Sequence, residues 1–447
     1  MYIKEDPQSQ LGDLPFAQFV FDKNHVLVKL GQAIQWDNLL GYLGKFYSAK
    51  HGRPTTPLRA QAGTLIIKFI KNLSDREAVA YVTENIYAQR FCGLSPAQAT
   101  GFMHPATGLA QFRAKIGVEG MAFIGEILTC VATHRSLKKQ DRLIIDTTCV
   151  PLDILYPTDT RLLERCRQSI LKLFKKAKEL GLNIGYRTYA RTARKIFLTF
   201  TKMSKPKQKT RKKVHKQMFQ FVRRNLKQLM DLRELATCKL GKQCQSDIAV
   251  GSYLKELKTV VTRVRTILHQ QKLLRSGMVS IPNRIVSFHK DHCRPIVRGK
   301  FPLSTEFGPK ILVGIVKSCA YVIEAFQNNC ADATMVSTAL RWFKQRFGRL
   351  PKKLLGDRGF YSKWRVGLLE KMGIVAGLQQ RGKNVQTSKL QQRMIRQRLP
   401  IEALISLSKR KFGWGKCRAR IPQHEASWIG MGAACMNVHR TFLVRPP

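Results

Sequence analysis

The stretch that decides the fold is Lys352-Lys353-Leu354-Leu355-Gly356-Asp357-Arg358-Gly359-Phe360-Tyr361-Ser362. Its apolar pair, Leu354 and Leu355, predicts the end of a buried strand, and Gly356 lets the backbone turn. Asp357 then stands at the carboxyl end of the strand, where open α/β sheets place their ligands. Asp and Gly after a strand are also ordinary loop residues, so this stretch alone does not show whether the turn binds a ligand. The sequence on either side is needed to distinguish the two.

The region around this stretch alternates between strand and helix patterns. Two neighbouring strands precede a series of helices and strands, which predicts an α/β domain with a mixed sheet. The expected elements are strands 311–316 and 321–326 in a hairpin around Cys319, helix 331–347 closed by Gly348, strand 354–357, helix 364–372 and strand 374–378.

A further strand is expected upstream, over 142–150, and it carries one acid, Asp146. Burial of a lone carboxylate is costly, so Asp146 needs a cation, a metal ion or a hydrogen-bond cluster as its partner. The alternative is a local bond to Thr147 or Thr148, and this strand alone does not decide between the two.

A second acid of interest, Glu402, lies in the stretch 398–410, which predicts a helix. Pro400 is best placed at the helix start, so Glu402 falls in the first turn, where an acid favours the helix dipole without any catalytic role. Lys409 follows Glu402 by about two turns and shares its face, and Arg398 lies just before the helix.

The N-terminal part reads as helices. A pattern from Thr55, with Pro57 in the first turn, is followed by a capping box at Ser74–Glu77 and a helix end at Gly93. Two more helices are expected over 107–117 and 119–136, and a closing helix over 424–439. Such compact helices fit a DNA-reading module or a plain bundle equally well.

Charge is the strongest bulk property, because 79 Lys and Arg against 28 Asp and Glu give a net charge of +51. An excess of this size predicts an anionic partner, most simply a phosphate backbone. The mainly helical region 161–280 concentrates it, since 186–227 holds fifteen cations, interleaved aromatic residues and no acid. A solvated charged face is the alternative. Residues 202–213 are expected to form a loop, and the cations singled out for DNA are Arg211, Lys212, Lys213, Arg223 and Arg224.

Other function classes receive little support. The eleven cysteines lack C-x-x-C spacing and read as reduced, mostly buried residues of a cytosolic protein. His289, His292 and Cys293 resemble a metal cluster without a second half, so we expect a loop or strand edge there. No signal peptide or bilayer-spanning apolar run is recognised, which predicts an intracellular protein without a membrane role.

Taken together, the three acids resemble the pattern of bacterial insertion-sequence DDE transposases. One acid lies on a first strand, one at the end of a later strand and one on a following helix. Arg398, Glu402 and Lys409 match the R, E and K of the family signature Y-x2-R-x3-E-x6-K. Its tyrosine position is occupied by Ile395, a departure that puts a hairpin route for second-strand cleavage in doubt.

Shorter stretches resemble the same family. They are Leu73–Glu77 with Phe91–Leu94, Tyr156–Thr160, Phe307–Lys310 and Asp357–Ser362, and together the similarity spans about 50–440. It implies an α/β fold with an RNase H-like mixed sheet, a helical insertion and an N-terminal all-α domain. The expected segments are an extension 1–50, a helical DNA-binding domain 51–138, a catalytic domain 139–411 interrupted by the basic insertion 161–280, and a basic, helical C-terminal segment 412–447.

The resemblance also implies the chemistry. Asp146, Asp357 and Glu402 would be the catalytic residues and the ligands of two Mg²⁺ ions, for which Mn²⁺ can substitute. Water would cleave a phosphodiester at the element's end, and the freed 3′-hydroxyl would attack target DNA. Arg398 and Lys409 would hold phosphates near the cut. The implied partners are terminal inverted repeats and target DNA, bound by a homodimer on paired ends in the bacterial cytoplasm, at the nucleoid.

Two other functions stay open. The chain could be a non-catalytic nucleic-acid-binding protein of the same fold, or a plain RNase H-like nuclease that does not join strands. Three further acids compete for the site. Asp153 and Asp159 are kept as alternates, the latter as a turn or helix-cap residue, whereas Asp332 is expected to cap a helix.

Overall fold

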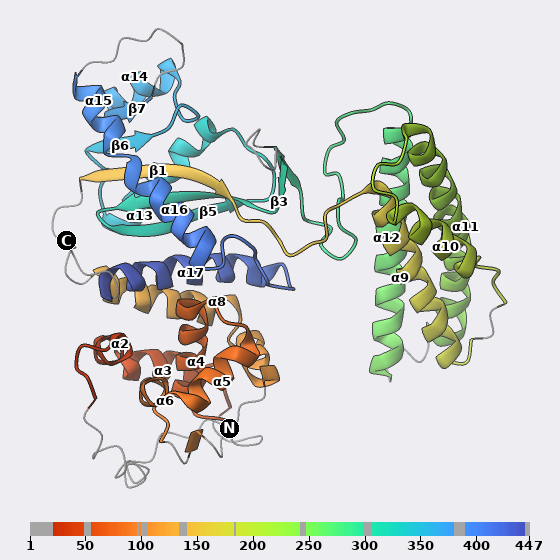
Figure 1. Ribbon diagram of the computed structural model, residues 1–447, viewed down its shortest axis with the longest axis horizontal. Coiled ribbons are helices and arrows are strands. Elements are labelled where there is room, and N and C mark those ends of the chain that lie inside the picture. The colour runs from red at the N-terminus through yellow and green to blue at the C-terminus, as the bar shows by residue number, and fades with distance from the viewer. Residues whose placement is uncertain are drawn as a thin grey trace. The chain divides into compact units, whose positions relative to one another are not determined.

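The computed structural model describes the chain in two compact units, 1–153 with 296–447 and 154–295 (Figure 1). The residues that it describes are 21–48, 55–95, 98–99, 106–133, 141–182, 185–241, 247–297, 305–379 and 389–442.

A mixed five-stranded sheet forms the centre of the first unit, in the order β5-β4-β1-β6-β7. Strand β1 pairs antiparallel with β4 and parallel with β6, β4 pairs antiparallel with β5, and β6 pairs parallel with β7. This confirms the expected α/β fold with a mixed sheet. The strands are β1 (Arg142–Cys149), β4 (Lys310–Val316), β5 (Cys319–Phe326), β6 (Lys353–Gly356) and β7 (Val375–Leu378).

The hairpin between β4 and β5 turns one residue earlier than expected. Lys317 and Ser318 form the turn, and Lys317 has a φ of 53°. Cys319 is therefore the first residue of β5 and not part of the turn. The strand predicted over 142–150 is observed as β1, which lies between β4 and β6 in the sheet.

One face of the sheet is covered by the helices that follow β5. A 3₁₀ turn η3 (Asp332–Met335) leads into α13 (Val336–Phe347), which ends at Gly348 with a φ of 72°. Leu143 and Ile145 of β1 pack with Phe343 of α13 in a buried apolar cluster. Because side chains alternate along a strand, Asp146 lies on the opposite face from these two residues. Helix α14 (Lys363–Lys371) joins β6 to β7.

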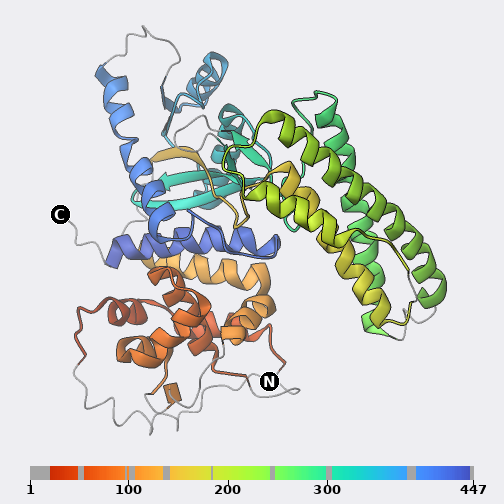
Figure 2. The ribbon, with the colours of Figure 1, turned by 45° about the vertical axis from the view of Figure 1, so that its right-hand side comes forward.

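Helix α17 (Gln423–Phe442) joins the sheet to the N-terminal helices of the same unit. It packs against β5, α4 and α8 (Figures 1 and 2). The Asn437 side chain accepts a hydrogen bond from the Ala320 N–H and donates one to the Ala320 carbonyl, both at 2.8 Å. The preceding helices are α15 (Lys389–Arg396) and α16 (Leu399–Lys411), of which α16 contacts β1.

The N-terminal helices follow the sequence pattern. The capping box between Ser74 and Glu77 is present, and Gly93 ends a helix with a φ of 67°. The two helices expected after residue 106 are present within α8, which is broken between them at Gly117, where the backbone has a non-helical φ of 60°. The helices are α2 (Val26–Ala33), α3 (Trp36–Gly44), α4 (Leu58–Lys71), α5 (Asp75–Glu84), α6 (Ile86–Cys92) and α8 (Ala106–Thr133).

Helix α8 is also the one described helix that is long and apolar enough to cross a membrane, judged by length and composition over Thr107–Thr133. By composition, therefore, the prediction that the chain has no apolar run long enough to span a bilayer is wrong for this helix. The helix packs against α17, and Leu109, Phe112 and Ile116 on it are buried inside the protein. Its apolar character is thus explained by a protein core.

Over its described residues, the second unit forms a bundle of four helices around a core of its own. They are α9 (Asp159–Glu179), α10 (Ala190–Thr201), α11 (Gln208–Leu240) and α12 (Ile248–Arg275). Helix α11 packs along α9 and α12 (Figure 2). The loop expected over 202–213 is shorter, because α11 begins at Gln208 and includes Arg211, Lys212 and Lys213. Apolar residues at helical spacing, such as Val214 and Met218, extend the helix into that stretch.

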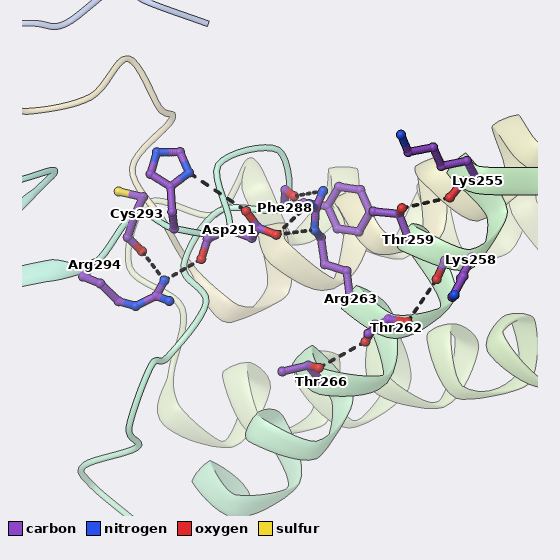
Figure 3. Close-up of polar contacts among 11 residues, drawn as sticks. Lys255, Lys258, Thr259, Thr262, Arg263, Thr266, Phe288, Asp291, Cys293 and Arg294 are labelled. Carbon is purple, nitrogen blue, oxygen red and sulfur yellow. Dashed lines mark hydrogen bonds and ion pairs between the residues drawn. The ribbon is translucent and has the colours of Figure 1, made fainter. Parts of the chain in front are cut away.

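Arg263 contributes two of the hydrogen bonds that anchor the segment after α12 (Figure 3). The Arg263 guanidinium donates to the Asp291 carboxylate at 2.9 Å and to the Phe288 carbonyl at 3.0 Å. His292 and Cys293 lie in this loop, as expected for them. Two short strands, β2 (Pro295–Val297) and β3 (Thr305–Phe307), pair in a separate sheet.

Candidate active site

Asp146 sits in the central strand of the sheet, and its side chain is 15% exposed. Its Oδ1 accepts a hydrogen bond from the Thr147 backbone N–H at 2.7 Å. The local bond that sequence reasoning left open therefore exists, although the backbone and not a hydroxyl donates it. One neutral donor does not compensate a largely buried carboxylate, so the surrounding charges matter.

Those charges leave Asp146 hard to ionise. Burial, then the nearby Asp357 carboxylate and more weakly Asp332, raise the pKa of Asp146 from 3.8 to about 6. The Thr147 N–H and the Arg398 guanidinium oppose the rise. A carboxyl group whose pKa is raised by a neighbouring carboxylate is typical of functional sites, where a bound cation can relieve the repulsion.

Asp357 follows β6 directly, at the carboxyl end of the strand, as the sequence predicts. Its Oδ1 accepts a hydrogen bond from the Gly359 N–H at 2.8 Å. A Cβ atom on Gly359 would lie 2.5 Å from Asp332 Oδ2 and 3.0 Å from Asp357 Oδ1. A side chain at this position would therefore displace at least one of the two carboxylates, both of which lie next to Gly359.

Asp332 is a competing acid whose role was wrongly predicted from the sequence. It begins η3 but caps nothing, since no side-chain cap bond is formed there, and the expected capping role is wrong. Its Oδ1 instead accepts from Thr147 Oγ1 at 2.8 Å and pairs with Lys310 Nζ at 2.7 Å. Both partners belong to neighbouring strands, β1 and β4. The sequence did contain one signal for this contact. Because side chains alternate along a strand, Thr147 faces the opposite side from Asp146 and can reach the α13 side of the sheet.

Arg398 connects the first acid to the third. Its guanidinium lies 3.7 Å from Asp146 Oδ2 and 2.6 Å from Glu402 Oε1. Arg398 is at the N-cap position of α16, with Pro400 in the first turn, so Glu402 lies one turn further along the same helix. The Glu402 side chain is 54% exposed, which leaves this carboxylate accessible to a ligand.

Lys409 lies further along α16, and its Nζ is 3.1 Å from Glu306 Oε1 of β3. The two alternate acids are engaged elsewhere. Asp153 pairs with Lys416 at 2.8 Å. Asp159 pairs with Arg284 at 2.9 Å within the second unit. Asp159 is the first residue of α9 and not its cap, because Thr158 supplies the capping oxygen.

The five cations singled out in the basic region all lie on α11 with exposed side chains. Buried residues such as Val214, Met218 and Val222 occupy the other side of the helix. The side chains of all five cations are therefore exposed to solvent in the second unit. They are Arg211, Lys212, Lys213, Arg223 and Arg224.

The site can be tested for its fit to a metal ion. Across the described residues, no group of three or more His, Cys, Asp or Glu side chains is arranged to hold one. The donor set is nevertheless made of carboxylate oxygens, which suit hard cations such as Mg²⁺. The raised pKa of Asp146 beside Asp357 is the repulsion that such a cation would remove. In their chemistry, Asp146 and Asp357 therefore fit a divalent cation, although the described acids form no cluster of three.

Comparison with known proteins gives two family matches. Residues 15–114 match the family described as "Transposase domain (DUF772)", and residues 316–438 match "Transposase DDE domain". The second match includes Asp332, Asp357 and Glu402, whereas Asp146 lies outside both. An uncharacterized protein, ORF8 in the nfe locus of Rhizobium meliloti, is 30% identical over 182 residues, which cover 39% of this chain and 84% of that protein. No solved structure matches.

Proposed function

Because the chain belongs to the insertion-sequence DDE transposases, we propose that it cuts phosphodiester bonds at the ends of its element and joins the freed 3′ ends to target DNA. Support for this proposal comes from two pairwise relationships in the first unit that link Asp146 to Asp357 and, through Arg398, to Glu402. Asp146 feels the charge of Asp357, and one guanidinium joins Asp146 to Glu402.

The core in this proposal is RNase H-like. Support comes from the strand order, in which three antiparallel strands, β5, β4 and β1, continue into two parallel strands, β6 and β7. Asp146 lies on the central strand of this sheet and Asp357 at the end of its parallel neighbour. The two acids therefore approach from adjacent strands, which is where an α/β sheet presents its ligands.

Asp146, Asp357 and Glu402 are the residues that would hold divalent cations, which DDE transposases generally use. We expect two Mg²⁺ ions, with Mn²⁺ able to substitute. When bound, such ions activate an attacking oxygen and stabilise a leaving one. Asp332 is placed as a positioning residue, because it fixes Thr147 next to Asp146 and bounds the Asp357 turn.

Arg398 and Lys409 would contact DNA phosphates near the cut. The Arg398 guanidinium now balances two carboxylates, and its planar fork also matches two phosphate oxygens. Binding of cations to the acids would leave Arg398 available for the DNA. Lys409, paired with Glu306, offers a point charge two turns along the same helix.

The partners in this proposal are the terminal inverted repeats and the target DNA, bound by a homodimer that pairs two ends. The N-terminal helices, within the region matched to the DUF772 transposase domain, would read the repeats. The exposed cations of α11 would hold the DNA backbone without reading sequence. The place of action is the bacterial cytoplasm, at the nucleoid.

The decisive experiment is cleavage of a duplex that carries the end of the element and its flanking DNA, with and without Mg²⁺. Asp146→Asn, Asp357→Asn and Glu402→Gln should each abolish cleavage while binding persists, because the fold does not need their charges. Asp153→Asn is the matched control, since that exposed acid pairs with Lys416 away from the triad. Mg²⁺-dependent cleavage by any triad variant, with contaminating nucleases excluded, would overturn the assignment.

The same assay separates the other two functions. Salt-sensitive binding by the unaltered protein without cleavage of any substrate would identify a non-catalytic DNA-binding protein. Turnover without strand joining would identify a plain nuclease.

A further inference from the structure

Two arginines of the second unit converge on one tyrosine ring. The Arg187 guanidinium carbon lies 4.9 Å from the centre of the Tyr189 ring, and that of Arg224 lies 4.5 Å from it. Each contact is a cation–π interaction, which is favourable. Their combination brings two positive charges together at one ring, and this mutual repulsion is unfavourable unless an anion joins them.

No acid compensates the two arginines in the described part of the chain. Neither guanidinium pairs with a carboxylate there, and both side chains are exposed. Two exposed guanidinium groups without a carboxylate leave their donors directed to solvent, ready for an outside anion.

The backbone that carries this pair is held in place from α11. The Asn225 side chain donates to the Thr188 carbonyl at 3.4 Å, and the Gln228 side chain donates to the Arg187 carbonyl at 3.2 Å. Tyr189 adopts a left-handed conformation, with a φ of 53°, which a residue with a side chain rarely adopts. The segment is thus fixed before any ligand arrives, so the arginines need little ordering on binding.

The same place is the start of α10. Tyr189 is the N-cap of this helix, and no side chain caps its first N–H groups. The partial positive charge of a helix start adds to that of the two arginines. Phosphate groups are anions of the shape that paired guanidinium groups and a helix start both favour.

We propose that Arg187, Tyr189 and Arg224 form an arginine clamp that holds one phosphate of a DNA backbone. The clamp rests on the proposed function in one respect, because DNA is the polyanion on which a transposase acts. Tyr189 contacts no phosphate in this role but keeps the two guanidinium groups together. The clamp reads no base, so it contributes equally to every sequence.

Its test is the slope of log affinity against log salt, measured with the full chain on duplex DNA of random sequence in EDTA. Each neutralised phosphate contributes about 0.9 to the magnitude of this slope. Arg187→Ala and Arg224→Ala should each lower it by about 0.9, and the double variant should lower it no further, because both arginines hold the same phosphate. A double variant that lowers it by about 1.8 would mean two separate phosphates and overturn the clamp. Unchanged slopes in the single variants would overturn it as well.

Variants of Tyr189 test whether its ring holds the two arginines together or whether they act as independent charges. Tyr189→Phe keeps the ring and should keep the slope, whereas Tyr189→Ala should lower it like the loss of an arginine. Arg233, exposed on the same helix, gives the matched control, since Arg224→Ala with Arg233→Ala should be additive. Circular dichroism at each variant establishes that the bundle is folded. The assay contains no divalent ion, so a protein without cleavage activity would leave this result unaffected, and the two proposals can fail separately.

Discussion

The guanidinium of Arg398 lies between the carboxylates of Asp146 and Glu402, 3.7 Å from the first and 2.6 Å from the second. The two acids come from β1 and α16, which are far apart in the sequence. The Arg398 guanidinium therefore lies between two acids where a metal-dependent mechanism would place a metal ion. This suggests that Arg398 balances the acids before metal and DNA bind.

Replacement of Arg398 tests this dual role. We expect Arg398→Ala to slow cleavage by about 100-fold or more, because a charged donor to the reacting phosphate is lost. Arg398→Lys should recover part of the rate, since it restores the charge but not the planar fork. Single-turnover cleavage at saturating DNA is the measurement. A rate within a factor of two of the unaltered protein in the Ala variant would remove Arg398 from the mechanism.

The raised pKa of Asp146 predicts that replacing this residue with asparagine stabilises the folded protein, by an amount that depends on pH. Its pKa is about 6 in the folded protein against an ordinary value of 3.8, so the folded state binds the proton more tightly than the unfolded state. The resulting destabilisation is absent below about pH 4, grows as the pH rises towards 6 and is complete above it, at about 3 kcal/mol. Asp146→Asn should therefore be more stable than the unaltered protein at pH 7.5, and equally stable near pH 4.

Urea unfolding in EDTA at the two pH values measures this difference. Asp153→Asn is the control, because an exposed ion pair contributes only about 0–1 kcal/mol. Addition of Mg²⁺ should stabilise the unaltered protein and not Asp146→Asn. If Asp146→Asn proves less stable at pH 7.5, the Arg398 contact outweighs the burial and repulsion that we cite.

Gly359 gives a steric test of the acidic turn. A Cβ at this position would lie 2.5 Å from Asp332 Oδ2, so Gly359→Ala must displace one of the two carboxylates. A misplacement of about 1 Å can lower a rate by about 100-fold, and we expect that loss of cleavage with the fold retained. Gly367→Ala on α14 is the control, since nothing lies within 4 Å of its Cβ and the helix should gain stability. Equal rates for both variants would show that the turn tolerates the shift.

The ion pair between Lys310 and Asp332 predicts a coupling that a double-mutant cycle can measure. Lys310→Met and Asp332→Asn should each destabilise the first unit by about 1–3 kcal/mol, because each leaves a partly buried charge without its partner. The double variant should cost less than the sum of the two. An additive result would show that the pair at 2.7 Å contributes nothing, and would leave Thr147 as the relevant partner of Asp332.

Local signals in the sequence predicted a large part of the fold. The capping box at Ser74, the helix end at Gly93 and the strand before Asp357 are each set by a few neighbouring residues, and all are observed. Asp332 was misjudged because its partners, Thr147 and Lys310, come from other strands, and an acid before a helix resembles a cap in sequence alone. Contacts between distant segments leave no periodic pattern to recognise.

The position of α17 bears on how the chain is made. Strand β5 and helices α4 and α8, which α17 covers, all leave the ribosome before it does. The apolar surfaces that pack against α17 are therefore exposed during translation, and we expect chaperones to bind them. The basic bundle, by contrast, is one continuous segment that can fold cotranslationally. A nascent transposase would then mature in two stages, with the DDE-containing half completed last.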